Sequence, residues 1–121
     1  MEKMETEIFR ELGFTEREIK VYLALLELGS TTVGPITTKT RLQSAKVYET
    51  LDKLKERGLV SFVIVSKTKY FEAADPKEIL NLMEERKRRF NEILEELRLK
   101  QKYAKSKQIA VVHEGFKSIK A

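Results

Sequence analysis

The sequence has no cysteine and no tryptophan, and its 121 residues include one histidine, two prolines and five glycines. Because cysteine is missing, disulfides, thiolate metal sites and cysteine nucleophiles are excluded. The glycines are scattered and form no phosphate-binding loop. His113 has no pattern of catalytic or metal-ligating residues around it, and we interpret it as an ordinary exposed or strand-edge residue. We therefore expect no enzyme, and with it no catalytic residue, no metal and no cofactor.

Long hydrophobic runs are also missing. Runs such as "VYLALL" at 21–26 and "FVIV" at 62–65 are too short to span a membrane. The N-terminal "MEKMETEIF" is acidic and lacks the apolar core of a signal peptide. Charged residues make up 36% of the chain, while glutamine and asparagine are rare, a usage typical of heat-adapted proteins. These features predict a cytoplasmic protein of a thermophile, with no membrane partner.

The basic residues are unevenly distributed along the chain. The net charge is +5 and the isoelectric point is near 9.4, yet residues 1–75 hold 12 basic and 12 acidic side chains. Within them, residues 31–75 hold eight basic and five acidic side chains. Such local clustering indicates nucleic-acid binding more clearly than net charge does. The cluster consists of Lys39, Arg41 and Lys46, with Lys67 and Lys69 further along.

Helix and strand signals follow one another in the order of a winged helix-turn-helix. Thr15 and Glu18 form a capping-box pattern and Gly29 is a stop signal, which predicts a helix between them. Residues rich in β-branched and aromatic side chains flank the polar turn Ser66–Lys67 and predict a two-stranded hairpin. The expected fold is mainly α with a small β-hairpin wing: helices over 2–12, 13–29, 31–40 and 44–57, a hairpin within a first domain of residues 1–74, and a long helix over 75–107.

The segment "TRLQ" at 40–43 joins the third and fourth predicted helices by a tight turn, as in a helix-turn-helix. Val47, Leu51 and Leu54 form an apolar stripe that predicts the buried face of the fourth helix, with Tyr48 packing beside it. The N-terminal end of this helix is then expected in the major groove of double-stranded DNA, and the basic turn and wing on phosphates. The expected DNA-binding residues are Lys39, Thr40, Arg41, Gln43, Ser44, Ala45, Lys46, Thr50, Lys67 and Lys69.

The outer face of the fourth helix also allows a second interpretation. Glu49, Asp52 and Glu56 oppose the electrostatic attraction to DNA, and winged-helix domains also mediate protein–protein contacts. The sequence favours a DNA-binding transcription regulator. The alternative is a winged-helix interaction module of the transcription machinery that does not bind DNA by itself.

The predicted long helix, roughly 45 Å in length, carries an apolar seam with near-heptad spacing that Arg86 and Lys100 interrupt. In a monomer the far part of this seam would be exposed to water, which favours a coiled-coil-like homodimer. The alternative is a helix that folds back on its own domain. The residues expected at the dimer contact are Ile79, Met83, Phe90, Ile93, Leu94 and Leu97. Beyond the helix, residues 108–121 predict a short strand or tail.

Three stretches carry a family resemblance: "LGFTEREIKVYLALLELGSTT", "TKTRLQSAKVYETLDKLKERGLV" and "KYFEAADPKEIL". Over about residues 12–85 the chain resembles the N-terminal winged-helix domain of TrmB-like archaeal transcription regulators. The resemblance implies a dimeric DNA-binding regulator, often of sugar uptake and metabolism, with a C-terminal effector domain that binds a small molecule.

The chain departs from the family pattern in two places. Arg41 stands where the family commonly has glycine, and we expect it to adopt a left-handed conformation at a small cost. "IAVVHEGFKSI" at 109–119 is similar to the opening of the effector domain, which is absent beyond it. The chain is therefore either a fragment of a longer regulator or a short natural member, and we do not expect it to bind a small-molecule effector.

Overall fold

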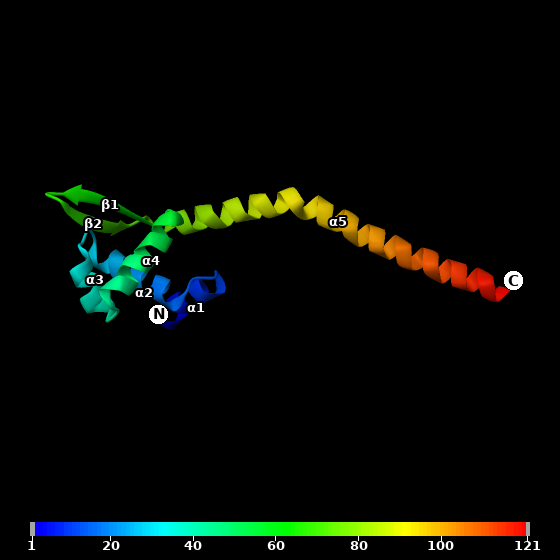
Figure 1. Ribbon diagram of the computed structural model, residues 1–121, viewed down its shortest axis with the longest axis horizontal. Helices are drawn as coiled ribbons and strands as arrows, with labels where there is room; N and C mark the ends of the chain where they lie inside the picture. The colour runs from blue at the N-terminus through cyan, green and yellow to red at the C-terminus, as the bar shows by residue number, and fades with distance from the viewer. Residues whose placement is uncertain (1, 121) are drawn as a thin grey trace. The chain divides into compact units, whose positions relative to one another are not determined.

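The chain forms a winged helix-turn-helix followed by a long helix in the computed structural model (Figure 1). The structure describes the backbone of residues 2–120 and the side chains of residues 6–112. The chain divides into two units, Met1–Leu82 and Met83–Ala121. Within the described residues the elements are α1 (Glu2–Glu11), α2 (Glu16–Leu28), α3 (Val33–Thr40), α4 (Ser44–Glu56), β1 (Val60–Val65), β2 (Thr68–Ala73) and α5 (Lys77–Lys120).

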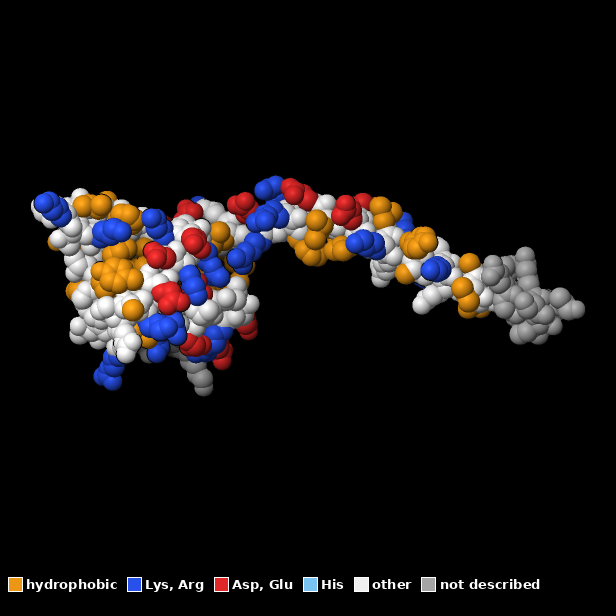
Figure 2. Space-filling view, viewed as in Figure 1, with side chains coloured by type: hydrophobic (Ala, Val, Ile, Leu, Met, Phe, Trp, Pro, Cys, Tyr) orange, Lys and Arg blue, Asp and Glu red, His pale blue; other side chains and the backbone are white. Residues whose placement is uncertain are grey.

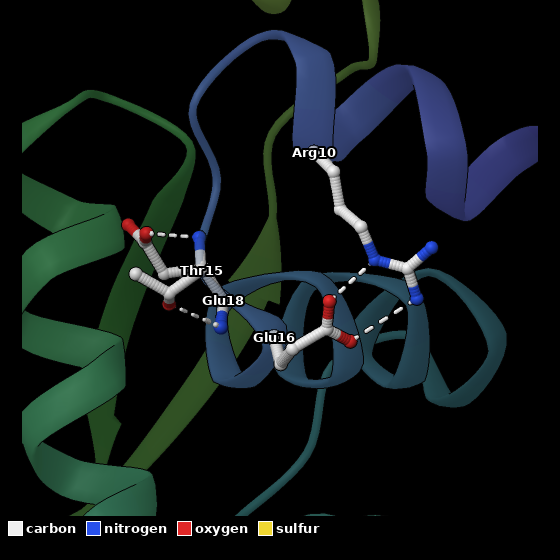
Figure 3. A network of polar contacts seen from close by, with 4 residues as sticks. All are labelled: Arg10, Thr15, Glu16 and Glu18. Atoms are coloured by element: carbon white, nitrogen blue, oxygen red, sulfur yellow. Dashed lines mark hydrogen bonds and ion pairs between the residues drawn. The ribbon is translucent and has the colours of Figure 1, made fainter.

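The start of α2 is fixed by the predicted capping box. The Thr15 hydroxyl accepts from the backbone N–H of Glu18 at 3.2 Å, and the Glu18 carboxylate accepts from the backbone N–H of Thr15 at 2.9 Å (Figure 3). In the same view Arg10 of α1 reaches Glu16 in the first turn of α2. This hydrogen bond lowers the pKa of Glu16. Both contacts position the beginning of α2 against the segment before it.

The core of the first unit lies between α2, α4 and the hairpin. Its fully buried members include Tyr22 of α2 and Leu51 of α4, and Phe71 of β2 packs on the same cluster. The Tyr22 hydroxyl donates to the carbonyl oxygen of Ala74 at 2.9 Å, which joins α2 to the end of β2. Burial of side chains of this size contributes about 2 kcal/mol each, so these residues hold the unit together.

The hairpin is antiparallel and has the predicted turn. Its register pairs Val60 with Ala73 and Val65 with Thr68. Ser66 and Lys67 have φ angles of 49° and 68°, the left-handed pair that gives a two-residue hairpin the twist of its strands. A bridge between Thr31 and Phe71 adds two backbone hydrogen bonds, of 2.9 and 2.6 Å. The loop before α3 is thereby fixed to the hairpin.

The long helix differs from the prediction at its C-terminal end. The sequence predicted a helix to about residue 105–107 and then a short strand or tail over 108–121, but α5 continues to Lys120. The physical reason is that a single strand leaves its backbone groups unpaired unless it joins a sheet, whereas a helix pairs them internally. Residues 108–112 contain no glycine or proline that would end a helix. The side chain of His113 lies outside the described residues.

Replacement of Tyr22 by phenylalanine tests the contact between α2 and β2. Y22F removes the hydrogen bond to Ala74 and should lower the free energy of unfolding at pH 7 by about 1 kcal/mol. Y48F, at an exposed tyrosine, is the matched control and should leave it unchanged. Chemical denaturation measures both.

The same pair of variants has an expected pH dependence. Burial, with a further contribution from Asp75, raises the pKa of Tyr22 above its ordinary value of 10.0. The folded state therefore favours the protonated hydroxyl, so the stability that it contributes is present below pH 10 and is lost as pH rises through the folded-state pKa. The stability difference between wild type and Y22F should shrink above about pH 10. A difference that stays constant would contradict this role of the hydroxyl.

Candidate nucleic-acid interface

The turn between α3 and α4 depends on the backbone conformation of Arg41. Arg41 has φ 61° and ψ 23°, the left-handed conformation expected from the sequence, and its N–H donates to the carbonyl oxygen of Thr37 at 2.7 Å. The Thr40 hydroxyl donates to the carbonyl oxygen of Ile36 at 2.7 Å and accepts from the N–H of Leu42 at 3.3 Å. These bonds stop α3 and turn the chain into α4. They also leave the Arg41 side chain exposed.

One face of α4 packs in the core, as predicted. Val47, Leu51 and Leu54 are buried. Thr50 is buried with them, since only 3% of it is exposed, and its hydroxyl donates to the carbonyl oxygen of Lys46 at 2.7 Å. The prediction that Thr50 faces DNA is therefore wrong. The reason is its helical position, three residues after Val47 and four before Leu54, which places it inside the apolar stripe.

The prediction for Tyr48 is wrong in the opposite direction, because Tyr48 is exposed where burial was predicted. The sequence predicted that it packs beside Val47, yet it is 51% exposed on the outer side of α4. The next residue on a helix points about 100° away, so Val47 and Tyr48 do not share a face. The spacing of Val47, Thr50, Leu51 and Leu54 is the signal that identifies Tyr48 as exposed. It lies one helical turn after the predicted DNA-binding residues Ser44 and Ala45.

The N-terminal end of α4 presents small and polar side chains. Gln43, Ser44 and Ala45 are exposed, and neither Ser44 nor Ala45 is large enough to hold another surface away. Lys46 is half-buried, and its Nζ lies 3.8 Å from a carboxylate oxygen of Glu49 on the next turn. This end of the helix can approach a flat or grooved partner closely.

Basic residues lie on both sides of α4. Lys39 of α3 forms an ion pair of 2.5 Å with Glu27 of α2, an exposed contact that can be exchanged for another anion. On the other side, Arg17 and Lys53 line a hollow of about 280 Å³ between the start of α2 and α4, together with three acidic residues, Glu16, Glu18 and Glu49, so this side is mixed in charge. The sequence prediction missed Arg17, because its distance from α4 along the chain hides how close the two helices lie.

The hairpin combines basic and apolar side chains (Figure 2). Lys67 is exposed in the turn, and the Nζ of Lys69 lies 4.6 Å from the centre of the Phe62 ring, a cation–π contact that holds it along the strand. Three consecutive apolar residues near the tip, Val63, Ile64 and Val65, are also exposed. The wing is therefore less polar than its two lysines suggest.

Comparison with known proteins identifies the family. Residues 9–77 match the family described as the sugar-specific transcriptional regulator TrmB. The chain belongs to this family. The family match confirms the resemblance seen in the sequence, and it covers the helix-turn-helix, the hairpin and the segment that leads into α5.

Individual proteins similar to this TrmB-family chain include one relative by sequence and two solved structures. The uncharacterized protein YrhO of Bacillus subtilis is 36% identical over 74 residues, which make up 61% of this chain and 26% of YrhO. The archaeal chromatin protein TrmBL2, whose structure is described as showing a novel mode of DNA binding, has a TM-score of 0.71 at 19% identity, over 92% of this chain and 43% of TrmBL2. A possible transcriptional regulator from Methanosarcina mazei Go1 has a TM-score of 0.58 at 16% identity, over 78% of this chain and 84% of that one.

These similarities concern the fold, and two of the matched proteins are much longer than this chain. The structural likenesses establish the fold, a winged helix-turn-helix with a long C-terminal helix. The chain spans about a quarter of the length of YrhO and less than half of TrmBL2. Among the described residues, no cluster of three or more acidic, histidine or cysteine side chains is placed to hold a metal ion. Each helix in the described part is too short or too polar to cross a lipid bilayer.

The conformation of Arg41 in this TrmB-family chain can be tested through stability. R41G should raise the free energy of unfolding by about 0.5–1 kcal/mol relative to R41A, since only glycine adopts the left-handed conformation without steric cost. Both variants lose the same cation, so the comparison isolates the backbone. Thermal or chemical denaturation supplies the measurement, and an R41G protein less stable than R41A would contradict the left-handed turn.

Proposed function

We propose that the chain binds double-stranded DNA through its winged helix-turn-helix and acts as a transcription regulator. The observation that carries this proposal is the N-terminal end of α4, where exposed small side chains follow directly on a tight turn that exposes Arg41. In helix-turn-helix proteins this part of the second helix enters the major groove, and small side chains there allow base edges to come close.

The described contacts divide the proposed DNA-binding residues into two groups. The first group is suited to phosphates and consists of Arg41, Lys67 and Lys39. Exposed cations attract the DNA backbone without regard to its sequence. Lys39 must first exchange its ion-pair partner Glu27 for a phosphate. Gln43, Ser44 and Ala45 at the start of α4 are suited to base edges, with Tyr48 one turn further on. Lys46 follows the base-edge residues on α4, and its cation is suited to a phosphate. The Thr40 hydroxyl is used in the hydrogen bonds of the turn, so Thr40 supports DNA binding by fixing the shape of the turn.

We also propose that the regulator works as a homodimer joined by α5. Met83, Phe90 and Leu97 are each more than 40% exposed on this helix, and Ile93 and Leu94 lie between them on the seam. Exposure of these apolar side chains to water is unfavourable, and a second copy would cover them. Ile79, predicted as a further dimer residue, is instead half-buried against the core of the first unit.

Salt-dependent DNA binding tests the proposed function. A double variant with Arg41→Ala and Lys46→Ala should bind duplex DNA more weakly, and the slope of log affinity against log salt should fall by about two, one for each lost phosphate contact. The matched control combines Arg98→Ala and Lys102→Ala, which removes two exposed cations of α5 outside the apolar seam. Fluorescence anisotropy at several salt concentrations measures both. An unchanged affinity and slope in the double variant would sink the proposal.

One observation favours a second candidate function. Val63, Ile64 and Val65 expose an apolar surface on the hairpin, and on the later turns of α4 Glu49, Asp52 and Glu56 offset the charge of Lys53 and Lys55. Both features suit a protein partner better than a phosphate backbone. The second candidate is therefore a winged-helix interaction module of the transcription machinery. Retention of genomic DNA fragments by the purified protein in the presence of competitor DNA would exclude it.

A further inference from the structure

The apolar seam of α5 within Met83–Ala121 has an unequal composition at its two heptad positions. The first position is apolar throughout, with Met83, Phe90 and Leu97. The second position alternates, with cations at Arg86 and Lys100 on either side of Ile93. All six side chains are exposed in the single chain. Two copies of this seam can pack together only in an arrangement that accommodates the cations.

We propose that α5 pairs with α5 of a second copy in antiparallel orientation, with Phe90 of each copy packed against Ile93 of the other. This inference rests on the homodimer proposed above and specifies its orientation and register. In a parallel pair, identical heptad positions face each other. Arg86 would then face Arg86 of the second copy, and Lys100 would face Lys100. Like charges brought together inside a seam are destabilising.

The antiparallel pair avoids these contacts. Here the first heptad position of one helix packs against the second position of the other, so each cation meets an apolar side chain. Arg86 lies opposite Leu97 of the second copy, and Lys100 lies opposite Met83. Long basic side chains can lay their methylene groups along such a residue while the charged end stays in water. The four central side chains, Phe90 and Ile93 from each copy, then form an apolar middle.

The residues that flank the seam select the register. With Phe90 opposite Ile93, Arg89 of each copy lies beside Glu96 of the other, which gives two symmetric ion pairs. A shift of one heptad in one direction brings Arg89 beside Arg89, and a shift in the other direction brings Glu96 beside Glu96. Neither Arg89 nor Glu96 has an ion-pair partner within the described residues, unlike Arg88, which pairs with Glu85 and Glu92 of its own helix. Both are therefore available to a second copy.

Disulfide trapping tests the orientation. The chain has no cysteine, so Met83→Cys and Lys100→Cys can be introduced singly as the only thiols. In the proposed pair neither variant links to itself, because Met83 and Lys100 lie 17 positions apart in the sequence, or about 25 Å along the helix. An equimolar mixture of M83C and K100C should give cross-linked dimers under mild oxidation. Rapid cross-linking within each single variant, with no additional cross-link between M83C and K100C in the mixture, would establish a parallel dimer. That result would overturn only the proposed orientation. Monomers at every concentration tested would overturn the dimer as well.

Charge reversal tests the register without cross-linking. R89E and E96R should each weaken self-association on the order of tenfold, because two attractive pairs become two repulsive ones. Their equimolar mixture should recover the wild-type affinity, since every acidic side chain then meets a basic one in the mixed dimer. Glu95→Arg, off the seam, is the matched control and should have little effect. Analytical ultracentrifugation measures all four. Single reversals without effect, or a mixture that stays weak, would contradict the register, while DNA binding by the first unit is measured independently.

Discussion

The packing of α4 against α2 is the constraint on which the rest of the molecule depends. Val47, Leu51 and Leu54 are buried together with Tyr22 and Leu25 of α2, and each side chain contributes about 2 kcal/mol by leaving water. A rotation of α4 about its axis would expose this stripe, so its outer face is fixed as well. The exposure of Ser44, Ala45 and Tyr48 follows from the burial of their neighbours.

Polar contacts at the ends of the two helices add direction to this packing. The Glu18 carboxylate, 2% exposed, caps α2 and lies 3.5 Å from the guanidinium of Arg57 at the end of α4. Arg57 also lies over the ring of Phe14, 5.0 Å from its centre. A buried carboxylate without a partner is costly, so this pair favours one alignment of the end of α4 with the start of α2. At the other end of α4, the left-handed Arg41 sets the angle at which α3 enters.

Much of this fold could be predicted from the sequence because its signals are local. The capping box at Thr15, the stop at Gly29 and the hairpin turn each depend on a few neighbouring residues, whereas the left-handed Arg41 was expected from the family resemblance. The predictions were wrong where the burial or the secondary structure of a residue depends on its position relative to other residues. Thr50 was predicted to face DNA, although its position lies within the apolar stripe. Residues 108–121 were predicted as a short strand or tail, although a single strand needs a sheet to pair its backbone groups.

The candidate site was predictable in its centre and less so at its edges. Gln43, Ser44 and Ala45 are exposed, as a helix-turn-helix requires. The spacing of the buried stripe on α4 also identifies Tyr48 as exposed, although the prediction packed it beside Val47. Arg17 could be found only from the positions of α2 and α4 in the fold. The ion pair between Lys39 and Glu27 likewise joins residues far apart in the sequence. It means that Lys39 must exchange one anionic partner for another before it contacts a phosphate.

DNA binding through the start of α4 is tested most directly by a map of backbone amide chemical shifts during titration with duplex DNA selected from genomic fragments. If α4 binds DNA, the largest changes should fall at the turn and the start of α4, residues 41–48, with a second group at the hairpin turn, and α5 beyond Met83 should change little. Changes confined to α5, or to the apolar strand residues Val63 and Val65, would contradict this mode of binding.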